Sequence, residues 1–324
     1  ATRSRPNGNL PPRPTGGQTS AESSGENGTN ARTPIPTGIG NIDEILEGGL
    51  GKGELGVIIG PTSFGKTSLT TAMASHAAIK GNKVLQIVFE DRIKQIQRKH
   101  IGRITGIEAK DLSKPENIEL VKQTLEQFPD KDKLQENLRI VKFPSGEKTA
   151  RQIERFIKKL INTGFKPDLT IIDYFECLEH EADKSVSNEF EKEGRTMRRF
   201  EAMAGELDMA IWIPSQGTKD SINLELVTMD KIGGSVKKAQ IAHVIMSIAR
   251  TVEDISNNKA TIAILKNRAG KSGKVLHNVE FNNGTCRINT DSVDEYDTMY
   301  QLKKKEQEVN TKLAQEVFKL AKNT

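Results

Sequence analysis

The chain has 324 residues, with 48 Lys and Arg against 43 Asp and Glu. This length allows one large domain or two small ones, and the net charge of +5 permits nucleic-acid binding without arguing for it. Aromatic residues make up only 5%, and no apolar run approaches the roughly 20 residues of a membrane span, so we expect neither a wide base-stacking platform nor a membrane protein. The two cysteines, Cys177 and Cys286, are far apart and lack metal-site spacing; they could form one disulfide, but the pattern favours a reduced, cytoplasmic protein.

Composition divides the chain into three parts. Residues 1–34 are rich in Pro, Gly, Ser, Thr and Asn, which predicts a disordered segment, either a linker between domains or a plain tail. Residues 35–290 carry the periodic apolar sequence of a folded domain. Residues 291–324 predict a charged helical tail with a patchy apolar face.

Within the central part, apolar periodicity predicts helices that alternate with strands. In chain order we expect a helix in 37–50, a strand at 53–60, a helix at 66–80, a strand at 83–90, helices across 91–136, a strand at 138–143, a helix at 149–164, a strand at 169–175, a helix at 189–208, and strands at 209–216, 242–250, 259–268 and 275–282. Asn-rich turns at 257–258 and 282–284 suggest hairpins among the last strands. The pattern predicts an α/β domain whose mostly parallel central sheet is flanked by helices and ends in an antiparallel edge.

A glycine-rich loop lies between the first strand and the following helix. Residues 60–67 read Gly-Pro-Thr-Ser-Phe-Gly-Lys-Thr and fit the phosphate-loop pattern G-x-x-x-x-G-K-[ST]. Such a loop turns its N–H groups toward an anion, and the helix N-terminus adds a positive dipole. The residues expected to hold ATP or another NTP are Gly60, Pro61, Thr62, Ser63, Phe64, Gly65, Lys66, Thr67 and Ser68. Lys66 would reach the β and γ phosphates, and the Thr67 hydroxyl would ligate Mg²⁺.

Two carboxylates are candidates for the metal and for catalysis. Asp173 ends an apolar strand, where a carboxylate can hold Mg²⁺ through water. Glu90 ends the strand after the loop helix and is our candidate general base, with Asp91 as its adjacent rival. The alternative is that Glu90 and Asp91 are surface charges that cap the next helix.

A polar strand end and the loop after it suggest a link to nucleic acid. Gln216 ends the strand at 209–216 and could hydrogen-bond the γ-phosphate, which makes it a candidate catalytic residue. The loop that follows supplies glycines for close backbone approach and lysines as counter-charge to a phosphate chain. The candidate DNA-binding residues are Lys231, Gly233, Gly234, Lys237 and Lys238. A solvated loop without a ligand is the alternative.

The order of these pieces resembles the RecA-like P-loop ATPases, and specifically the DnaB-type (superfamily 4) replicative helicases, with a likeness to phage-encoded members. The matching pieces are "GPTSFGKTSL", "FE" at 89–90, "IIDY" at 171–174, "PSQ" at 214–216, "GGS" at 233–235 and "KNRAGKSG" at 266–273. The chain departs from the family pattern at Glu176, where members often have Gln, and in the basic segment "VKKAQIAH", where bacterial members tend to be acidic.

The resemblance implies a homo-oligomer, a hexameric ring that hydrolyses NTP between subunits and moves along single-stranded DNA. It also implies the cytoplasm of a bacterial cell or phage-infected host, and a primase or helicase loader as a further partner. Carried over by position, Lys66 and Thr67 bind phosphate and Mg²⁺, Glu90 is catalytic, and Asp173 is the Walker-B carboxylate.

The same resemblance gives Gln216 a coupling role and makes Lys266 and Arg268 cations donated to a neighbouring subunit. The two cations lie at alternate positions of one strand and therefore point the same way. A structural salt bridge to an acidic residue of the same chain is the alternative.

Two other functions share most of this chemistry. A RecA- or RadA-like recombination ATPase would carry a similar phosphate loop and K-N-R motif, although the chain lacks zinc-finger cysteines. A KaiC-like ring ATPase would need no DNA, and the basic residues at 231–238 argue against it.

Overall fold

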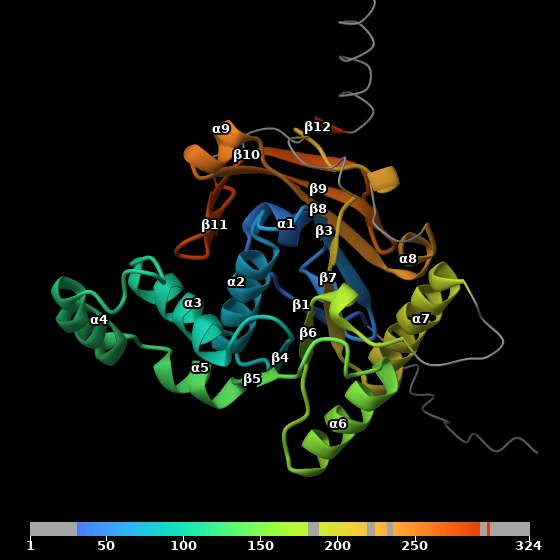
Figure 1. Ribbon diagram of the computed structural model, residues 1–324, viewed down its shortest axis with the longest axis horizontal. Helices are drawn as coiled ribbons and strands as arrows, with labels where there is room; N and C mark the ends of the chain where they lie inside the picture. Colours follow the sequence, from blue (N-terminus) through green and yellow to red (C-terminus); the bar gives the residue numbers. More distant parts are fainter. Residues whose placement is uncertain (1–30, 181–187, 219–223, 232–235, 292–296, 299–324) are drawn as a thin grey trace, which may run out of the picture. The chain divides into compact units, whose positions relative to one another are not determined.

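A computed structural model describes residues 31–180, 188–218, 224–231, 236–291 and 297–298. Residues from Arg32 onward form one compact unit. Its centre is a single sheet, which within the described residues has ten strands in the order β11-β10-β9-β8-β3-β7-β6-β4-β5, with β12 pairing with β10. The strands from β8 to β5 run parallel, and β9, β10, β11 and β12 extend the sheet with antiparallel pairs (Figure 1). The predicted parallel sheet with an antiparallel edge is confirmed.

The longest strands of this sheet are β9 and β10, with nine residues each. The bounds of the strands are β3 Leu55–Gly60, β4 Val84–Val88, β5 Leu138–Lys142, β6 Leu169–Asp173, β7 Ala210–Gln216, β8 Val244–Ala249, β9 Lys259–Asn267, β10 Lys274–Asn282, β11 Arg287–Asn289 and β12 Asp297–Thr298. A separate pair, β1 Pro34–Ile35 and β2 Leu50–Gly51, brackets the first helix.

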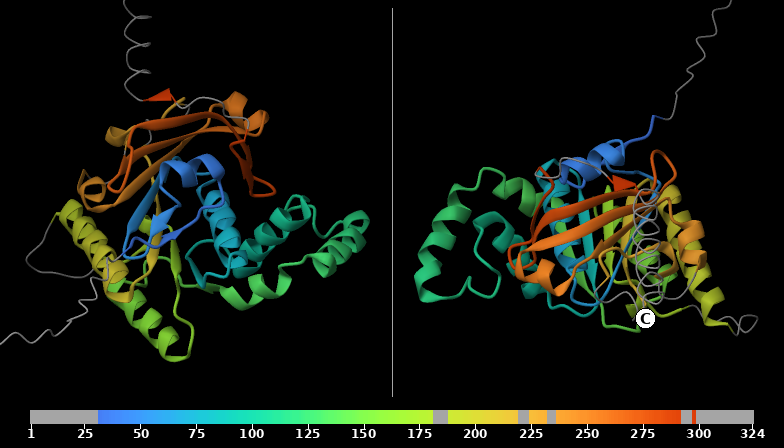
Figure 2. Two further views of the ribbon diagram at one scale, coloured as in Figure 1. Left: turned by 180° about the vertical axis from the view of Figure 1, so that it is seen from behind. Right: turned by 90° about the horizontal axis from the view of Figure 1, so that it is seen from above.

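Helices cover both faces of the sheet (Figures 1 and 2). Their bounds are α1 Gly40–Ile45, α2 Lys66–Ile79, α3 Ile93–Thr105, α4 Pro115–Gln127, α5 Lys131–Asn137, α6 Ala150–Asn162, α7 Glu189–Leu207, α8 Val236–Ile241 and α9 Val252–Ser256. Helices α1 and α2 bury Ile42, Leu69 and Met73 against one face, and α6 and α7 bury Ile153 and Phe200 against the other. Two hydrophobic cores therefore hold the sheet between them, as expected for a mostly parallel sheet.

The central strand β3 shows how the sequence produces this burial. Val57 and Ile59 belong to one core and Ile58 to the other, because successive side chains point to opposite faces. At Gly56 the neighbouring strand brings Trp212 so close that a Cβ would lie 2.3 Å from its ring. Glycine is thus needed here to let the large indole pack over the strand.

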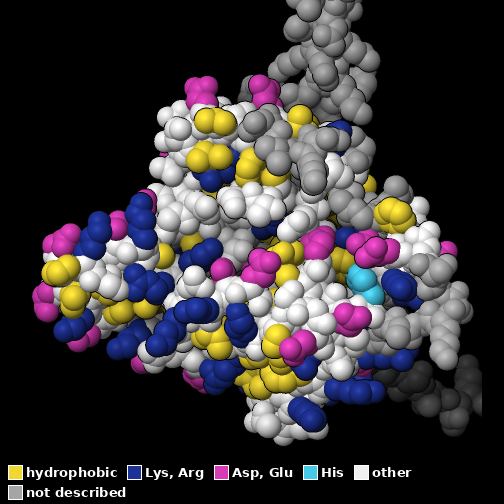
Figure 3. All heavy atoms as spheres, viewed as in Figure 1, with side chains coloured by type: hydrophobic (Ala, Val, Ile, Leu, Met, Phe, Trp, Pro, Cys, Tyr) yellow, Lys and Arg dark blue, Asp and Glu magenta, His cyan; other side chains and the backbone are white. Residues whose placement is uncertain are grey.

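The outer helices α3, α4 and α5 extend away from the sheet on the α2 side (Figure 1). Lys, Arg, Asp and Glu side chains are mixed with apolar ones over this part of the surface (Figure 3). Among the described residues, no helix combines the length and apolar character that crossing a membrane requires.

Three details differ from the sequence predictions. The folded unit begins by Arg32, before the predicted boundary at 34, because its guanidinium is bound to Glu54 and to the carbonyl oxygen of Gly49. The connection from β8 to β9, in which the turn at 257–258 was expected, also contains the short helix α9 just before that turn. Asp297–Thr298 lies in the predicted helical tail but forms strand β12; the rest of that tail beyond residue 298, and nearly all of the predicted disordered segment, lies outside the described residues.

Candidate nucleotide-binding site

The phosphate loop connects the end of β3 to the start of α2, as predicted. The loop turns sharply at Ser63 and Gly65, whose φ angles are +68° and +96°. A Cβ at Gly65 would lie 2.4 Å from the Phe281 ring, so the left-handed conformation and the close packing both require glycine there. The first N–H groups of α2 have no partner within the helix and point into the space above the loop, as an anion site requires.

Lys66, the first residue of α2, is folded back into this loop. Its side chain is 8% exposed, and Nζ donates to the carbonyl oxygens of Gly60 and Pro61 at 2.7 and 2.8 Å. Burial lowers the pKa of Lys66, while the negative charges of Glu176 and Asp173 raise it and partly offset that effect. The ammonium group is thereby held at the mouth of the loop without a direct carboxylate partner.

A pocket of about 220 Å³ opens above the loop and gathers most of the predicted site. Its lining residues are Thr62, Ser63, Gly65, Lys66, Thr67, Ser68, Val88, Glu90, Asp91, Lys99, Asp173, Tyr174, Gln216 and Asn283. Of the predicted loop residues, Gly60 and Pro61 contribute carbonyl oxygens to Lys66, and Phe64 is buried. Five strands and helices therefore converge on one small polar space at the carboxyl ends of the parallel strands, where ligands bind in open α/β sheets.

The oxygen atoms of Thr67 and Asp173 meet at the floor of this pocket. Asp173 is 6% exposed, and its burial raises its pKa to about 6 against the opposing effect of the hydrogen bond from Thr67. A hydroxyl and a carboxylate are hard oxygen ligands, and Mg²⁺ commonly takes only one or two such protein ligands beside water and phosphate oxygens. The pair therefore fits a magnesium site.

The two rival carboxylates lie just past the end of β4, which stops at Val88 rather than at the predicted residue 90. The Tyr174 hydroxyl donates to Glu90 Oε1 at 2.9 Å, whereas Asp91 Oδ2 lies 3.9 Å from Lys99 Nζ. Lys142 Nζ holds the turn by donating to the carbonyl oxygens of both carboxylate residues. Both carboxylates line the pocket, and only Glu90 receives the tyrosine hydroxyl.

Sequence reasoning missed three polar residues that line the pocket, namely Tyr174, Lys99 and Asn283. Tyr174 directly follows Asp173, so its position was a usable signal. Asn283 comes from the hairpin between β10 and β11, and its side-chain oxygen accepts a hydrogen bond from Ser68. No local pattern indicates that contact.

Gln216 occupies the last position of β7 and faces the pocket. The neighbouring Gly217 N–H donates to the Gly60 carbonyl oxygen at 3.1 Å, which ties this strand end to the phosphate loop. A group bound at the loop would therefore lie within the same small space as the Gln216 amide.

Lys266 and Arg268 lie at the opposite end of the sheet. Strand β9 runs antiparallel to β8, so that Asn267 pairs with Val244, which in turn pairs with Gly56 of β3. The phosphate loop begins four residues further along β3, a separation of about 13 Å along the strand alone. The two cations therefore do not join the pocket of their own chain.

The two cations do lie side by side. Lys266 Nζ and Arg268 Nη2 both donate to the Gln240 carbonyl oxygen, at 3.0 and 2.7 Å. Burial, followed by the charge of Arg268, lowers the pKa of Lys266. Among the described residues, no ion pair between Arg268 and a carboxylate is seen.

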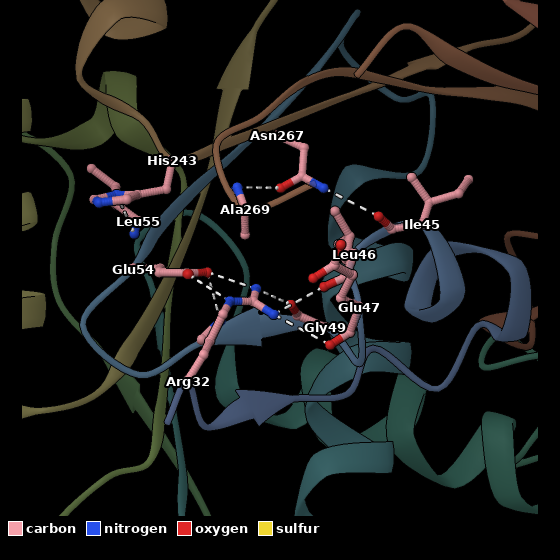
Figure 4. Close-up of polar contacts among 11 residues, drawn as sticks. Arg32, Ile45, Leu46, Glu47, Gly49, Glu54, Leu55, His243, Asn267 and Ala269 are labelled. Carbon is pink, nitrogen blue, oxygen red and sulfur yellow. Dashed lines mark hydrogen bonds and ion pairs between the residues drawn. The ribbon is translucent and has the colours of Figure 1, made fainter. Parts of the chain in front are cut away.

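The residue between them, Asn267, anchors this strand end (Figure 4). It is 6% exposed; its amide donates to the Ile45 carbonyl oxygen at 3.1 Å and accepts from the Ala269 N–H at 3.1 Å. Close by, Arg32 Nε donates to Glu54 Oε1 at 2.7 Å (Figure 4). Alternation along the strand thus turns Asn267 inward and both cations outward.

The predicted DNA-binding residues are only partly described. Lys231 ends a short 3₁₀ turn, Met229–Lys231, and is partly exposed. Gly233, Gly234 and the side chain of Lys237 lie outside the described residues. Lys238 is 1% exposed and bound to Glu176 and Glu193, so in this structure its ammonium group is not available to DNA, contrary to the prediction.

Comparison with known proteins agrees with this geometry. Two curated relatives, both described as "DNA repair and recombination protein RadB", are similar to parts of the chain. The protein of Methanobrevibacter smithii is 28% identical over 205 residues, 62% of this chain and 75% of the relative. The protein of Methanosphaera stadtmanae is 25% identical over 235 residues, 72% of this chain and 88% of the relative.

Two solved structures share the fold. The "ATPase Domain of G40P" aligns with a TM-score of 0.68 and 18% identity, over 80% of this chain and 91% of that one. A structure of a DnaB-like replicative helicase and its interactions with primase aligns with the same TM-score and identity, over 79% of this chain and 62% of that one. The family described as "DnaB-like helicase C terminal domain" matches residues 34–290. This chain therefore belongs to the DnaB-like helicase family through that domain.

Proposed function

We propose that the protein is a ring-forming, ATP-driven DNA helicase that moves along single-stranded DNA during replication. The observation that carries the proposal is the division of the catalytic groups between two ends of one sheet. The pocket holds Lys66, Thr67 and Asp173, while the outward-facing Lys266 and Arg268 lie too far away to reach it. A second copy of the chain placed against the pocket would supply these cations.

Within one pocket, each side chain has a role that its position supports. Lys66 exchanges its carbonyl partners for the β and γ phosphates, and the first N–H groups of α2 bind the remaining phosphate oxygens. Thr67 and Asp173 would hold Mg²⁺, which would supply charge neutralisation at the phosphates. Glu90, oriented by Tyr174, accepts the proton of the attacking water.

The cations from the neighbouring copy stabilise the transition state of ATP hydrolysis. Negative charge spreads over the γ-phosphate oxygens as the bond to the leaving group lengthens, and an arginine there accelerates hydrolysis by roughly 10³–10⁵ in systems where it acts in this way. Hydrolysis then depends on how two copies meet, so that each turnover can move one subunit against the next. Gln216 contacts the γ-phosphate and Lys231, Gly233, Gly234 and Lys237 contact the DNA backbone in this scheme.

Single-stranded DNA binding is the first test. A gel-shift at low salt, with and without a non-hydrolysable ATP analogue, should show binding that the analogue strengthens. A matched fork substrate should then lose its complementary strand when ATP and Mg²⁺ are added. Absence of DNA binding at low salt would exclude both the helicase and the recombination functions. The remaining candidate would then be a DNA-independent ring ATPase.

A recombination ATPase is the second candidate, because two RadB proteins are similar to the chain. The fork assay separates the two functions, since a helicase releases a strand without a homologous partner and a strand-exchange protein needs one. A primase is the partner most worth testing, because the structural relative described with primase shares this fold.

A further inference from the structure

A buried ion cluster lies behind the nucleotide pocket. Lys238 is 1% exposed, and its Nζ lies 3.2 Å from Glu176 Oε1, 3.3 Å from Glu193 Oε1 and 4.2 Å from the centre of the Phe175 ring. The second oxygen of Glu193 is buried and has no hydrogen-bond partner among the described residues. Lys238 and Glu193 are largely buried, whereas Glu176 is more exposed. A buried ion pair adds little net stability on average, so the cluster calls for a reason other than stability.

The members of this cluster come from four elements that surround the pocket. Glu176 lies in the 3₁₀ turn Phe175–Cys177, three residues after Asp173, and Glu193 lies on α7. Lys238 lies on α8, the helix that follows the predicted DNA-binding glycines. The fourth element is β7, which contributes Ser215.

Strand β7 connects the cluster to the pocket through adjacent residues. The Ser215 hydroxyl donates to Glu176 Oε1 at 2.6 Å and lies 3.4 Å from Lys238 Nζ. The next residue, Gln216, lines the nucleotide pocket, because neighbouring side chains of a strand point to opposite sides. A shift of this strand end on γ-phosphate binding would move Ser215 together with Gln216.

Glu176 is shared between the two sites. It is the ion partner of Lys238, and its charge also acts on Lys66 in the phosphate loop.

We propose that Lys238 is a positioning residue that couples the nucleotide pocket to the DNA-binding segment, through its contacts with Glu176 and Ser215. Breaking either contact would leave a buried charge partly uncompensated, so α8 follows the end of β7 rather than separating from it. The proposal rests on the proposed function only in taking DNA as the ligand of residues 231–237. Lys238 acts from inside the protein and does not bind the DNA itself.

The test compares DNA-stimulated with DNA-independent ATP hydrolysis in the full-length chain. Lys238→Met should leave turnover without DNA and the KM for ATP within about twofold of wild type, and should reduce the stimulation by DNA roughly fivefold or more. Lys238→Arg should keep the stimulation, because it keeps the charge. Lys159→Met, which removes an exposed lysine of α6, is the matched control and should behave as wild type.

A second variant and a second measurement keep the test decisive. If Lys238→Met does not fold, the double variant Glu176→Gln with Lys238→Gln removes the ion pair without changing the net charge of the cluster and should show the same loss of stimulation. Independently of DNA, a non-hydrolysable ATP analogue should change the rate of tryptic cleavage after Lys231 in the wild type and not in the Lys238 variant.

The outcomes separate the two proposals. A wild-type protein that DNA does not stimulate contradicts the proposed function, and the cleavage experiment then decides the coupling alone. Variants that retain the full stimulation and the full analogue response show that the cluster has no coupling role. A variant that loses turnover equally with and without DNA shows a structural role only and also overturns the inference.

Discussion

At the scale of single residues, substitution of Lys66 gives the most direct test of the site. The Lys66 side chain is buried in the phosphate loop and, among the described residues, hydrogen-bonds to carbonyl oxygens rather than to a carboxylate, so a phosphate can replace those contacts without breaking an ion pair seen there. Lys66→Ala should abolish ATP hydrolysis measured by phosphate release. Retained turnover in a folded variant would show that nucleotide is hydrolysed elsewhere.

Arg268 gives the corresponding test at the far end of the sheet. Arg268→Ala should retain binding of a fluorescent ATP analogue and lose roughly 10³–10⁵ in the rate of hydrolysis. Lys271→Ala is the matched control, because Lys271 is an exposed cation three residues away in the same turn. A small loss that both variants share would assign the effect to general surface charge instead.

The site residues that could be predicted are those that belong to a continuous sequence motif. Lys66 and Asp173 follow from the apolar strands before them and from the spacing of the loop, and the structure places both in the pocket. Lys238 could not be assigned, because whether a lysine is solvated or buried depends on Glu176, 62 residues away in the sequence. The contact of Ser68 with Asn283 could not be predicted either, because the two residues are 215 positions apart and no local sequence pattern indicates the contact.

At the scale of elements, alternating periodicity was enough to predict most helices and strands of the sheet. It could not give their order in space: β3 lies between β7 and β8, and both neighbours follow it by more than 140 residues. That order depends on how the two apolar faces are covered by α1 and α2 and by α6 and α7. The two-residue strands β1 and β2 are too short for any periodic signal.

The turn after β9 carries a prediction of its own. Asn267→Ala removes the bonds to the Ile45 carbonyl oxygen and from the Ala269 N–H, so the turn that presents the cations loses its anchor. We expect hydrolysis to fall on the order of 10- to 100-fold by misplacement, with nucleotide binding unchanged. Asn162→Ala, at an exposed position ending α6, is the control. Unchanged hydrolysis in Asn267→Ala would show that the cations need no such anchor.

The contact of Arg32 with Glu54, at the start of the folded unit, can be tested by its effect on the free energy of unfolding. Arg32→Met should lower the free energy of unfolding by about 1–3 kcal/mol at pH 7, because Glu54 loses its charged partner. Burial raises the pKa of Glu54, but the hydrogen bonds from Arg32 and from the Gly51 N–H outweigh it and leave the pKa lowered. The stabilisation is therefore present above the unfolded-state pKa and is lost as the pH falls through the folded-state value. Denaturation at pH 7 and at a pH well below the folded-state pKa of Glu54 should show a larger Arg32 effect at the higher pH, because the bonds from Arg32 to backbone carbonyl oxygens remain at both.

At the scale of the whole molecule, the division of the site implies that one copy cannot hydrolyse ATP efficiently. The pocket and the two cations occupy opposite ends of the sheet, so a closed ring of copies placed head to tail would bring each pocket against the cations of the next copy. Ring closure would also make every subunit equivalent, which suits movement along a single strand. The assembly should therefore be more active than its dilute subunits.

Mixing two inactive variants tests this claim most directly. Lys66→Ala keeps its cations and Arg268→Ala keeps its pocket, so equal amounts combined into mixed rings should restore hydrolysis at about a quarter of the interfaces. Native mass spectrometry of the mixture would establish that mixed rings form. We predict that the mixture hydrolyses ATP when neither variant does alone. Mixed rings that remain inactive would contradict a site shared between neighbouring copies.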